Sequence, residues 1–359
     1  MVGIIFINDL NVCPYIDKYI ETLNEQNQEY EIIIWDRSYF EGKKQRFPCK
    51  HIYKKNAKES DSAPVKLKDF YFYFRYVKKV LKAQKYDKLI ILSSLTGIFL
   101  NSVLRKKYRD RYIFDYRDAS YEFFGFYRKL LNQVIENSFF TCISSKGFRE
   151  ILPPNDYFMA HNFRPVSLKS KLDICRIRNE APFKVGYIGN LRNSAYVKQL
   201  IGLFKDDKRF TFILSGGGDN FEELKSYCAG MDNIVMTGRY EEDEKAAIVQ
   251  NVDLLCYNYP SSYINDYALA NKYYDSLIYK KPCIGNSETY SGRLIQQNGL
   301  GISIGLDCEN FSDHVYDYCM KFDRDAFKAN ADRELAKVLE DDKIYIEKIR
   351  EFINSEVKA

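Results

Sequence analysis

Three cations in the second half of the chain stand in positions that suit a diphosphate. Arg192 and Lys198 come shortly after the run that ends at Gly189, and Lys272 lies at the start of a later helical stretch. When a diphosphate leaves in a transfer reaction, negative charge develops on its oxygens, and cations and helix N-termini can stabilise that charge. These residues therefore predict a diphosphate site. The alternatives are a solvated loop residue for Arg192 and an ordinary helix-surface lysine for Lys198.

A second group of charged residues follows an apolar run in the first half. The strand predicted over residues 112–115 delivers Asp115, Arg117 and Asp118 to its carboxyl end. A carboxylate there can orient an acceptor hydroxyl or remove its proton. We predict that Asp118 is the catalytic group and that Arg117 contacts the acceptor or a phosphate. The alternative is an Asp–Arg pair that braces the loop.

Other familiar site patterns are weak. Gly216, Gly217 and Gly218 permit a tight turn after a strand. They lack the G-x-G-x-x-G spacing and the later acidic residue of a dinucleotide-binding dehydrogenase. Asp323-x-Asp325 resembles a metal-binding pair but lies in a charged segment, so we predict no metal site. Nine scattered cysteines without a C-x-x-C are typical of free thiols in a reducing cytoplasm.

Short apolar runs alternate with longer amphipathic stretches along the whole chain, and this alternation positions the candidate residues. Such alternation predicts parallel sheets covered by helices on both faces. Strands are expected at 2–7, 31–35, 88–93, 112–115, 139–144 and 157–160, and in the second half at 183–188, 210–215, 234–236, 252–257, 282–285 and 302–304. The fold class is therefore α/β, with two Rossmann-like domains facing each other across a cleft.

The predicted domains follow from where the alternation stops and restarts. Residues 1–164 form the first domain, which would bind the acceptor. A charged, proline-containing linker covers 165–182, and the second α/β domain covers 183–331, which would bind the donor. The tail, 332–359, is predicted to be a long charged amphipathic helix.

Six sequence blocks of the second half carry a family resemblance. In order and spacing they resemble the donor domain of GT-B glycosyltransferases of family 4, the bacterial surface-polysaccharide type; the blocks are FKVGYIGNLR, ILSGGGDNFEEL, NIVMTGRY, VDLLCYN, ANKYYDSLIYKKPCIGN and NGLGISI. The first half matches more loosely through FDYRDAS and TCISSKGF. The resemblance implies a GT-B fold and a metal-independent transferase that retains anomeric configuration.

The resemblance also implies roles for individual residues. Arg192 and Lys198 match the residues that bind the donor diphosphate, to which Gly189 and Lys272 are added. The turn formed by Gly238, Arg239 and Tyr240 would lie against the nucleotide base; the alternative is an ordinary turn before a helix.

At the positions expected to bind the donor ribose and the donor sugar, this sequence differs from the family. Asp275 stands where the family has a glutamate that binds the ribose, and it can accept hydrogen bonds from two hydroxyls. Tyr267 stands where the family has a second glutamate facing the donor sugar. Sugar selection is therefore expected to fall to the polar loop around Asn265 and to Asn271.

Charge is distributed unevenly between the two halves. Residues 1–160 carry a net charge of +8 and residues 161–359 a net charge of −3. A basic half predicts an anionic contact, either a membrane surface or a pyrophosphate-linked acceptor; no motif points to nucleic acid. The basic aromatic segment 66–85 either lies on an anionic bilayer or packs into the core through Phe70, Phe74, Val77 and Leu81, and core packing is favoured.

The sequence thus predicts a glycosyltransferase that moves a hexose or hexosamine from a nucleotide-diphosphate sugar, with a UDP-sugar favoured and no further cofactor. Its partners would be the nucleotide sugar and a glycan or lipid-linked glycan acceptor in surface-polysaccharide or capsule assembly. With neither a leader sequence nor a long apolar run, the chain is expected in the cytoplasm, with peripheral contact at the inner face of the membrane. The alternatives are a non-catalytic GT-B partner that binds nucleotide and a GT-B epimerase or phosphorylase.

Overall fold

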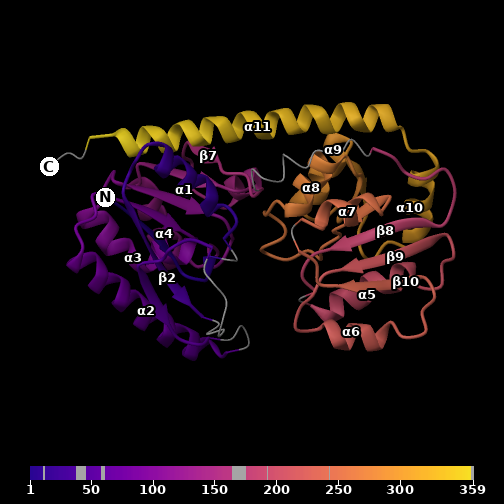
Figure 1. The fold of residues 1–359 in the computed structure, drawn as a ribbon, viewed down its shortest axis with the longest axis horizontal. Coiled ribbons are helices and arrows are strands. Elements are labelled where there is room, and N and C mark those ends of the chain that lie inside the picture. Colours follow the sequence, from indigo (N-terminus) through magenta and orange to yellow (C-terminus); the bar gives the residue numbers. More distant parts are fainter. Residues whose placement is uncertain are drawn as a thin grey trace. The chain divides into compact units, whose positions relative to one another are not determined.

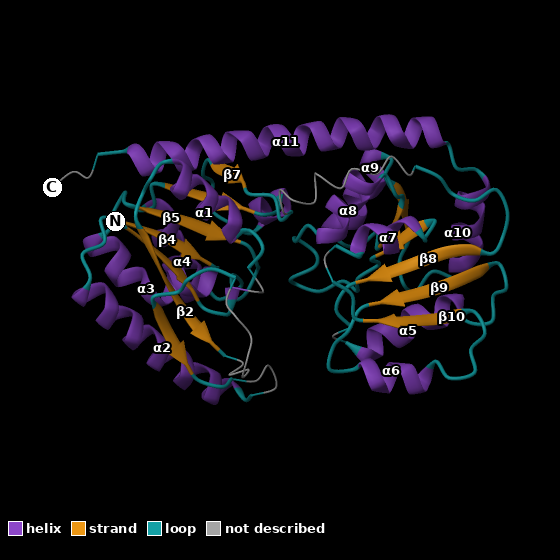
Figure 2. Ribbon diagram, viewed as in Figure 1, coloured by secondary structure: helices purple, strands orange, loops and turns teal. Residues whose placement is uncertain are grey.

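The computed structural model describes residues 1–10, 13–37, 46–57, 61–163, 175–191, 193–241 and 243–356. The chain divides into two compact units. The first unit comprises Met1–Arg164 and Leu339–Ala359, and the second comprises Pro165–Val338. Each unit is a parallel sheet covered by helices (Figures 1 and 2), so the predicted α/β class is confirmed.

Within its described residues, the first unit holds a seven-stranded parallel sheet in the order β3-β2-β1-β4-β5-β6-β7. The strands are β1 (Val2–Phe6), β2 (Tyr30–Asp36), β3 (His51–Lys54), β4 (Lys88–Leu92), β5 (Tyr112–Tyr116), β6 (Phe140–Ile143) and β7 (Tyr157–Met159). Most are fully buried apolar runs. The edge strand β3 is half-exposed and has no apolar run, which is why the sequence pattern misses it.

The second unit repeats this topology. The part of it that the structure describes forms a six-stranded parallel sheet in the order β10-β9-β8-β11-β12-β13. The strands are β8 (Phe183–Ile188), β9 (Phe210–Ser215), β10 (Ile234–Gly238), β11 (Leu254–Cys256), β12 (Cys283–Gly285) and β13 (Gly301–Ser303). In both sheets the strand order reverses next to the first strand of the unit, and ligands of such sheets bind beyond the carboxyl ends at that point.

Helices of the first unit lie on both faces of its sheet. The crossovers that carry α2 (Ala63–Ala83), α3 (Ser94–Lys107) and α4 (Gly125–Glu136) all run in the same direction across the sheet. Because parallel crossovers are right-handed, these three helices share one face. Helix α1 (Ile16–Glu25) belongs to a crossover in the opposite direction and lies on the other face, and a short turn of 3₁₀ helix covers Lys146–Glu150.

The basic aromatic segment 66–85 forms most of α2, and its core-packing interpretation holds for one face of the helix. Phe74, Val77 and Leu81 are buried, whereas Phe70 is half-buried. Phe70 and Phe74 both contact the ring of Phe99 on α3, with centroid separations of 5.6 and 4.6 Å. Helix α2 is therefore fixed to α3 by aromatic packing. No helix in the described ranges is long and apolar enough to cross a membrane.

The second unit carries six further helices in its described residues. They are α5 (Ser194–Phe204), α6 (Phe221–Tyr227), α7 (Lys245–Gln250), α8 (Asn271–Tyr279), α9 (Tyr290–Asn298) and α10 (Phe311–Met320). The sequence pattern does not predict α10. Only Phe311, Val315 and Cys319 of this helix are buried, so its apolar stripe is too narrow to stand out from the surrounding polar residues.

Helix α11 (Arg324–Asn354) begins earlier than the predicted position 332. Its first turns belong to the second unit, where Phe327 and Ala331 are buried. Its last turns belong to the first unit, where Tyr345, Ile349 and Phe352 join the core. The tail is therefore part of both units.

The C-terminal end of α11 is capped by a lysine of the first unit. The Lys88 ammonium donates to the backbone carbonyls of Phe352, Ile353 and Ser355 at 2.6–2.8 Å. Helix C-termini leave carbonyls without partners and carry partial negative charge, so a buried cation there stabilises the helix end.

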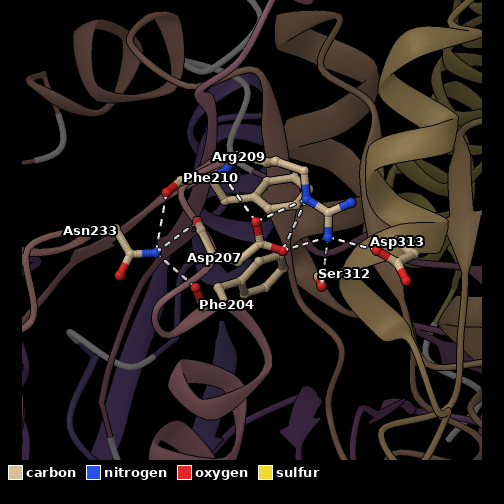
Figure 3. Close-up of polar contacts among 7 residues, drawn as sticks. All are labelled: Phe204, Asp207, Arg209, Phe210, Asn233, Ser312 and Asp313. Carbon is tan, nitrogen blue, oxygen red and sulfur yellow. Dashed lines mark hydrogen bonds and ion pairs between the residues drawn. The ribbon is translucent and has the colours of Figure 1, made fainter.

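The turn that leads into β9 shows how polar side chains fix the second sheet (Figure 3). Asn233 donates its amide to three backbone carbonyls around the turn. Arg209 bridges Asp207 and Asp313 of α10 at 2.7 and 2.6 Å. The hydrogen bonds from Arg209 lower the pKa of Asp207 to about 2. The start of β9 is thus tied to α10.

Candidate functional site

The carboxyl ends of β8 and β9 approach each other through glycines. The Gly189 amide donates to the Ser215 carbonyl at 2.8 Å, and the Gly216 amide donates to the Gly238 carbonyl at 2.8 Å. A Cβ atom on Gly216 would overlap the carbonyl oxygen of Gly189, and both glycines have positive φ, 155° and 142°. Only glycine permits this approach, and it leaves backbone groups at the edge where ligands bind.

Lys272 lies directly over this glycine turn. It is the second residue of α8, and its Nζ is 2.5 Å from the place that a Cβ on Gly189 would take. The structure therefore brings together Gly189 and Lys272, two of the residues predicted to bind the diphosphate. An ammonium and a helix N-terminus at the end of β8 can balance the charge of phosphate oxygens.

The other two predicted diphosphate residues differ in outcome. Arg192 lies outside the described residues. Lys198, on α5, forms an ion pair with Glu223 of α6 at 2.6 Å and lies over the ring of Tyr227. The alternative interpretation of Lys198, a helix-surface lysine, agrees better with these contacts.

The predicted base-binding turn lines a pocket of about 420 Å³ in the second unit. Arg239 and Tyr240 form part of its wall, and the buried apolar side chains of Ile213 and Val252 also line it. Gly238 does not line the pocket, and its carbonyl is used by Gly216 as described above. A pocket with an apolar interior and a cationic, aromatic rim suits a planar nitrogenous base.

Asp275, the predicted ribose ligand, is buried and ion-paired. Its Oδ1 accepts a hydrogen bond from the Lys245 ammonium of α7 at 2.6 Å. Glu244, the residue before Lys245, lines the pocket. Sequence reasoning missed Lys245, because nothing local to residue 245 indicates a partner on α8.

The predicted sugar-selecting residues lie in and after an ordered loop. The Asn265 side chain donates to the Pro260 carbonyl at 2.9 Å, and Asp266 accepts from Ser261 and from the Ser262 amide. Asn265 therefore braces the loop. Asn271 is exposed at the first position of α8, beside Lys272.

In the first unit, the contacts of Arg117 favour the loop-bracing interpretation. The guanidinium is 5% exposed and binds both carboxylate oxygens of Asp115, at 2.6 and 2.9 Å. It also donates to the Ala160 carbonyl at 2.8 Å and lies over the ring of Tyr15. Burial opposes the charged form, but Asp115 keeps the pKa of Arg117 above its usual range. Arg117 is thus enclosed, and it is a poor candidate for direct contact with an acceptor.

Asp118 has different surroundings. Its side chain is exposed beyond the carboxyl end of β5, and its backbone carbonyl accepts a 3.5 Å hydrogen bond from Ser94. Of the two residues predicted for catalysis, it is the one that a hydroxyl group can approach.

The described residues include no group of three or more His, Cys, Asp or Glu side chains that could hold a metal ion. All nine cysteines are free thiols, and most of them are buried.

The sequence matches no protein-family model and no curated protein. The structure, in contrast, resembles solved structures over nearly its whole length. The lipopolysaccharide outer core galactosyltransferase WaaB superposes with a TM-score of 0.61 at 14% identity, covering 98% of this chain and 99% of that chain. WaaG, a glycosyltransferase involved in lipopolysaccharide biosynthesis, gives 0.60 at 12% identity, covering 99% and 100%.

A third similar structure contains a nucleotide. Anabaena HepE in complex with UDP and glucose superposes with a TM-score of 0.60 at 10% identity, covering 97% of this chain and 98% of that chain. At such identities the likeness shows a shared fold and no more. The two parallel sheets, the long C-terminal helix and these near-complete superpositions together show that this chain has the GT-B fold.

Proposed function

We propose that this protein is a glycosyltransferase that moves a hexose or hexosamine from a UDP-sugar to a glycan or lipid-linked glycan acceptor. The setting would be the assembly of a surface polysaccharide, at the cytoplasmic face of the membrane. The position of Lys272 over the Gly189 turn, in the same unit as a pocket lined by Arg239 and Tyr240, is the observation that carries the proposal.

Each part of the donor has a proposed partner in the second unit. Lys272, the Gly189 turn and Arg192 bind the diphosphate, and the pocket formed with Arg239 and Tyr240 takes the base. Asp275 binds the ribose hydroxyls through the oxygen that Lys245 does not occupy, because the Lys245 ion pair fixes the other oxygen. Asn271, exposed beside Lys272, contacts the donor sugar, and Asn265 shapes the loop that faces it.

The proposed reaction breaks the bond between the anomeric carbon and the diphosphate oxygen, which keeps the electron pair. The acceptor hydroxyl oxygen bonds to that carbon on the face that the diphosphate leaves, which retains the configuration, and Asp118 receives the hydroxyl proton. Charge that develops on the departing diphosphate is stabilised by Lys272, Arg192 and the N-terminus of α8, without a metal.

Thermal unfolding of the full chain with a panel of nucleotides and nucleotide sugars tests the donor site. A ligand that binds only the folded state at ~100 times its Kd adds about 2.7 kcal/mol of stability. We expect UDP and one UDP-sugar to raise Tm selectively. Lys272→Gln should weaken UDP about tenfold or more, because it removes a charge-assisted hydrogen bond. Arg192→Ala is expected to act in the same direction.

Lys198→Gln is the matched control, since the Lys198 ammonium is engaged by Glu223 and should leave UDP affinity unchanged. Asp118→Asn should abolish sugar transfer and leave UDP affinity intact. Absence of a Tm shift with every nucleotide would contradict the proposal. Nucleotide binding without transfer to any acceptor would favour the second candidate, a non-catalytic GT-B partner, which Tyr267 and Asp275 in place of the family's two glutamates also support.

A further inference from the structure

Exposed apolar side chains gather in two segments of the first unit. Among the described residues, thirteen large apolar side chains are exposed, and eight of them lie within 65–72 and 121–126. The eight are Val65, Leu67, Tyr71, Phe72, Tyr121, Phe123, Phe124 and Phe126. Scattered exposed apolar residues are normal, but such concentration marks an interaction surface.

The segment 121–126, which we call the aromatic knuckle, is held rigidly from beneath. Glu122 is fully buried and accepts hydrogen bonds from the Tyr116 hydroxyl at 2.8 Å and from the Ser120 amide at 2.7 Å. The rings of Phe123 and Phe124 pack together, with centroids 4.5 Å apart. Phe126 is nevertheless 76% exposed. The segment therefore holds its aromatic rings in place and leaves them exposed.

The knuckle and the first turns of α2 belong to the same face and the same edge of the unit. Helices α2, α3 and α4 share one face of the sheet, and in parallel crossovers each helix begins near the carboxyl edge of the strands. Segment 65–72 lies at the start of α2, and the knuckle includes Gly125 and Phe126, the first two residues of α4.

This helical face is strongly basic. Over their described lengths, α2, α3 and α4 carry eleven lysines and arginines and two acidic residues. One of the acids, Asp69, is buried in an ion pair with Lys55. Arg128 and Lys129 are exposed directly after the knuckle.

A groove on the same face is lined by aromatic rings and by cations. Its volume is about 750 Å³, and it is lined by the rings of Phe74 and Phe99 and by Arg75, Lys78, Lys79 and Lys82. An apolar lining flanked by cations suits a molecule with an acyl part and an anionic headgroup.

We propose that this face, formed by the aromatic knuckle, the first turns of α2 and the basic residues of α2–α4, docks onto an anionic phospholipid bilayer. Aromatic rings insert at the interfacial level, and lysines and arginines are attracted to anionic headgroups. A second copy of this chain is a poorer occupant, because two such basic faces would repel each other. A nucleic acid would match the charge but not the aliphatic Val65 and Leu67.

The inference deepens the proposed function by assigning the surface through which the protein would reach a lipid-linked acceptor. It stands on separate observations, and the nucleotide tests above contain no lipid. A negative vesicle experiment would therefore leave the donor-site proposal intact, and a negative nucleotide experiment would leave the membrane-docking proposal intact.

Sedimentation of the full chain with vesicles tests the surface. We expect binding to phosphatidylcholine vesicles that contain phosphatidylglycerol, and much weaker binding to phosphatidylcholine alone. Phe123→Ser with Phe126→Ser should reduce binding about tenfold or more, because two exposed rings no longer insert. Lys78→Gln with Lys82→Gln should also reduce it about tenfold or more.

Matched controls replace exposed residues elsewhere. Ile344→Ser with Met320→Ser, on α11 and α10, should leave vesicle binding unchanged. Fluorescence of Trp35, the single tryptophan, verifies that each variant of the first unit is folded. The proposal is overturned if the wild type ignores anionic vesicles or if the phenylalanine variant binds them as well as the wild type. Preferential binding to a single-stranded oligonucleotide, or self-association abolished by the phenylalanine substitutions, would equally overturn it.

Discussion

The carboxyl edges of the two sheets have the same topology but use their charged residues differently. In the first unit, Asp118 is exposed, but the buried basic side chains near this edge bind carboxylates. Arg117 is enclosed by Asp115, Lys18 pairs with Asp342 of α11, and His161 contacts Asp341. In the second unit, glycine turns bring the strand ends together, and Lys272 and Arg239 lie over them.

This difference separates structural charges from candidate ligand-binding charges. Buried ionic groups require partners, so the first unit satisfies its ions internally and thereby fixes α11 and the end of β5. A cation placed over glycine backbone, as Lys272 is, has surroundings that a diphosphate can enter. The carboxyl edge of the same sheet topology therefore carries a structural site in one unit and a proposed binding site in the other.

We expect the largest effect from Arg117→Met, which tests whether the buried ion pair of the first unit is structural. The substitution leaves Asp115 buried without its cation, and breaking a buried pair typically costs about 3–5 kcal/mol. Urea unfolding followed by Trp35 fluorescence reports on the first unit, because this single tryptophan is buried there. Lys198→Met breaks a half-exposed pair of the second unit and, with unfolding followed by circular dichroism, should cost less than about 1 kcal/mol. If Arg117→Met impaired transfer without loss of stability, Arg117 would be a ligand contact instead.

A smaller effect is expected from Gly216→Ala. The new methyl group would overlap the Gly189 carbonyl, so the glycine turn must shift, at a cost of about 1–3 kcal/mol. Circular dichroism should show the second unit destabilised, the Trp35 transition unchanged and the UDP-induced rise in Tm lost. Gly202→Ala, on α5 with no atom within 4 Å of the new Cβ, is the control and should not destabilise. UDP binding preserved in Gly216→Ala would remove the glycine turn from the donor site.

The smallest effect concerns pH. Burial lowers the pKa of His161, so below about pH 6.5 the unfolded chain binds protons that the folded chain does not. Stability of the first unit should therefore fall as pH decreases from this value, and by less than in the two variants above. His161→Gln should reduce that dependence, whereas His314→Gln, at an exposed position of α10, should leave it intact. An unchanged pH profile in His161→Gln would show that another group is responsible.

Most of the fold was predictable because strands and helices leave local patterns. The strands β8 and β9 have the predicted bounds, since their apolar runs are bordered by polar turns. The misses were β3 and α10, which bury few side chains and so leave weak patterns. The family resemblance was carried by blocks of the donor domain, and the GT-B fold that it implied is confirmed.

The candidate site was predictable only in part. Gly189 and Lys272 were named separately from the sequence, and their contact required the folding of α8 onto the end of β8. Roles in binding and catalysis stay predictions for these residues, as for Asp118 and Asp275. Lys245 was not named, because its partner Asp275 lies on a different helix.

The sequence by itself determined where most strands and helices form, because their patterns involve residues that are close in the chain. It also determined that the first half is basic and that the second half carries the six blocks that resemble a donor domain. Only the tertiary structure decided which charges are enclosed and which are accessible. Arg117 and Asp118 are adjacent in the chain, yet one is buried and the other exposed. The physical reason is that the solvation of a charge depends on which distant elements pack around it, and no local pattern encodes that packing.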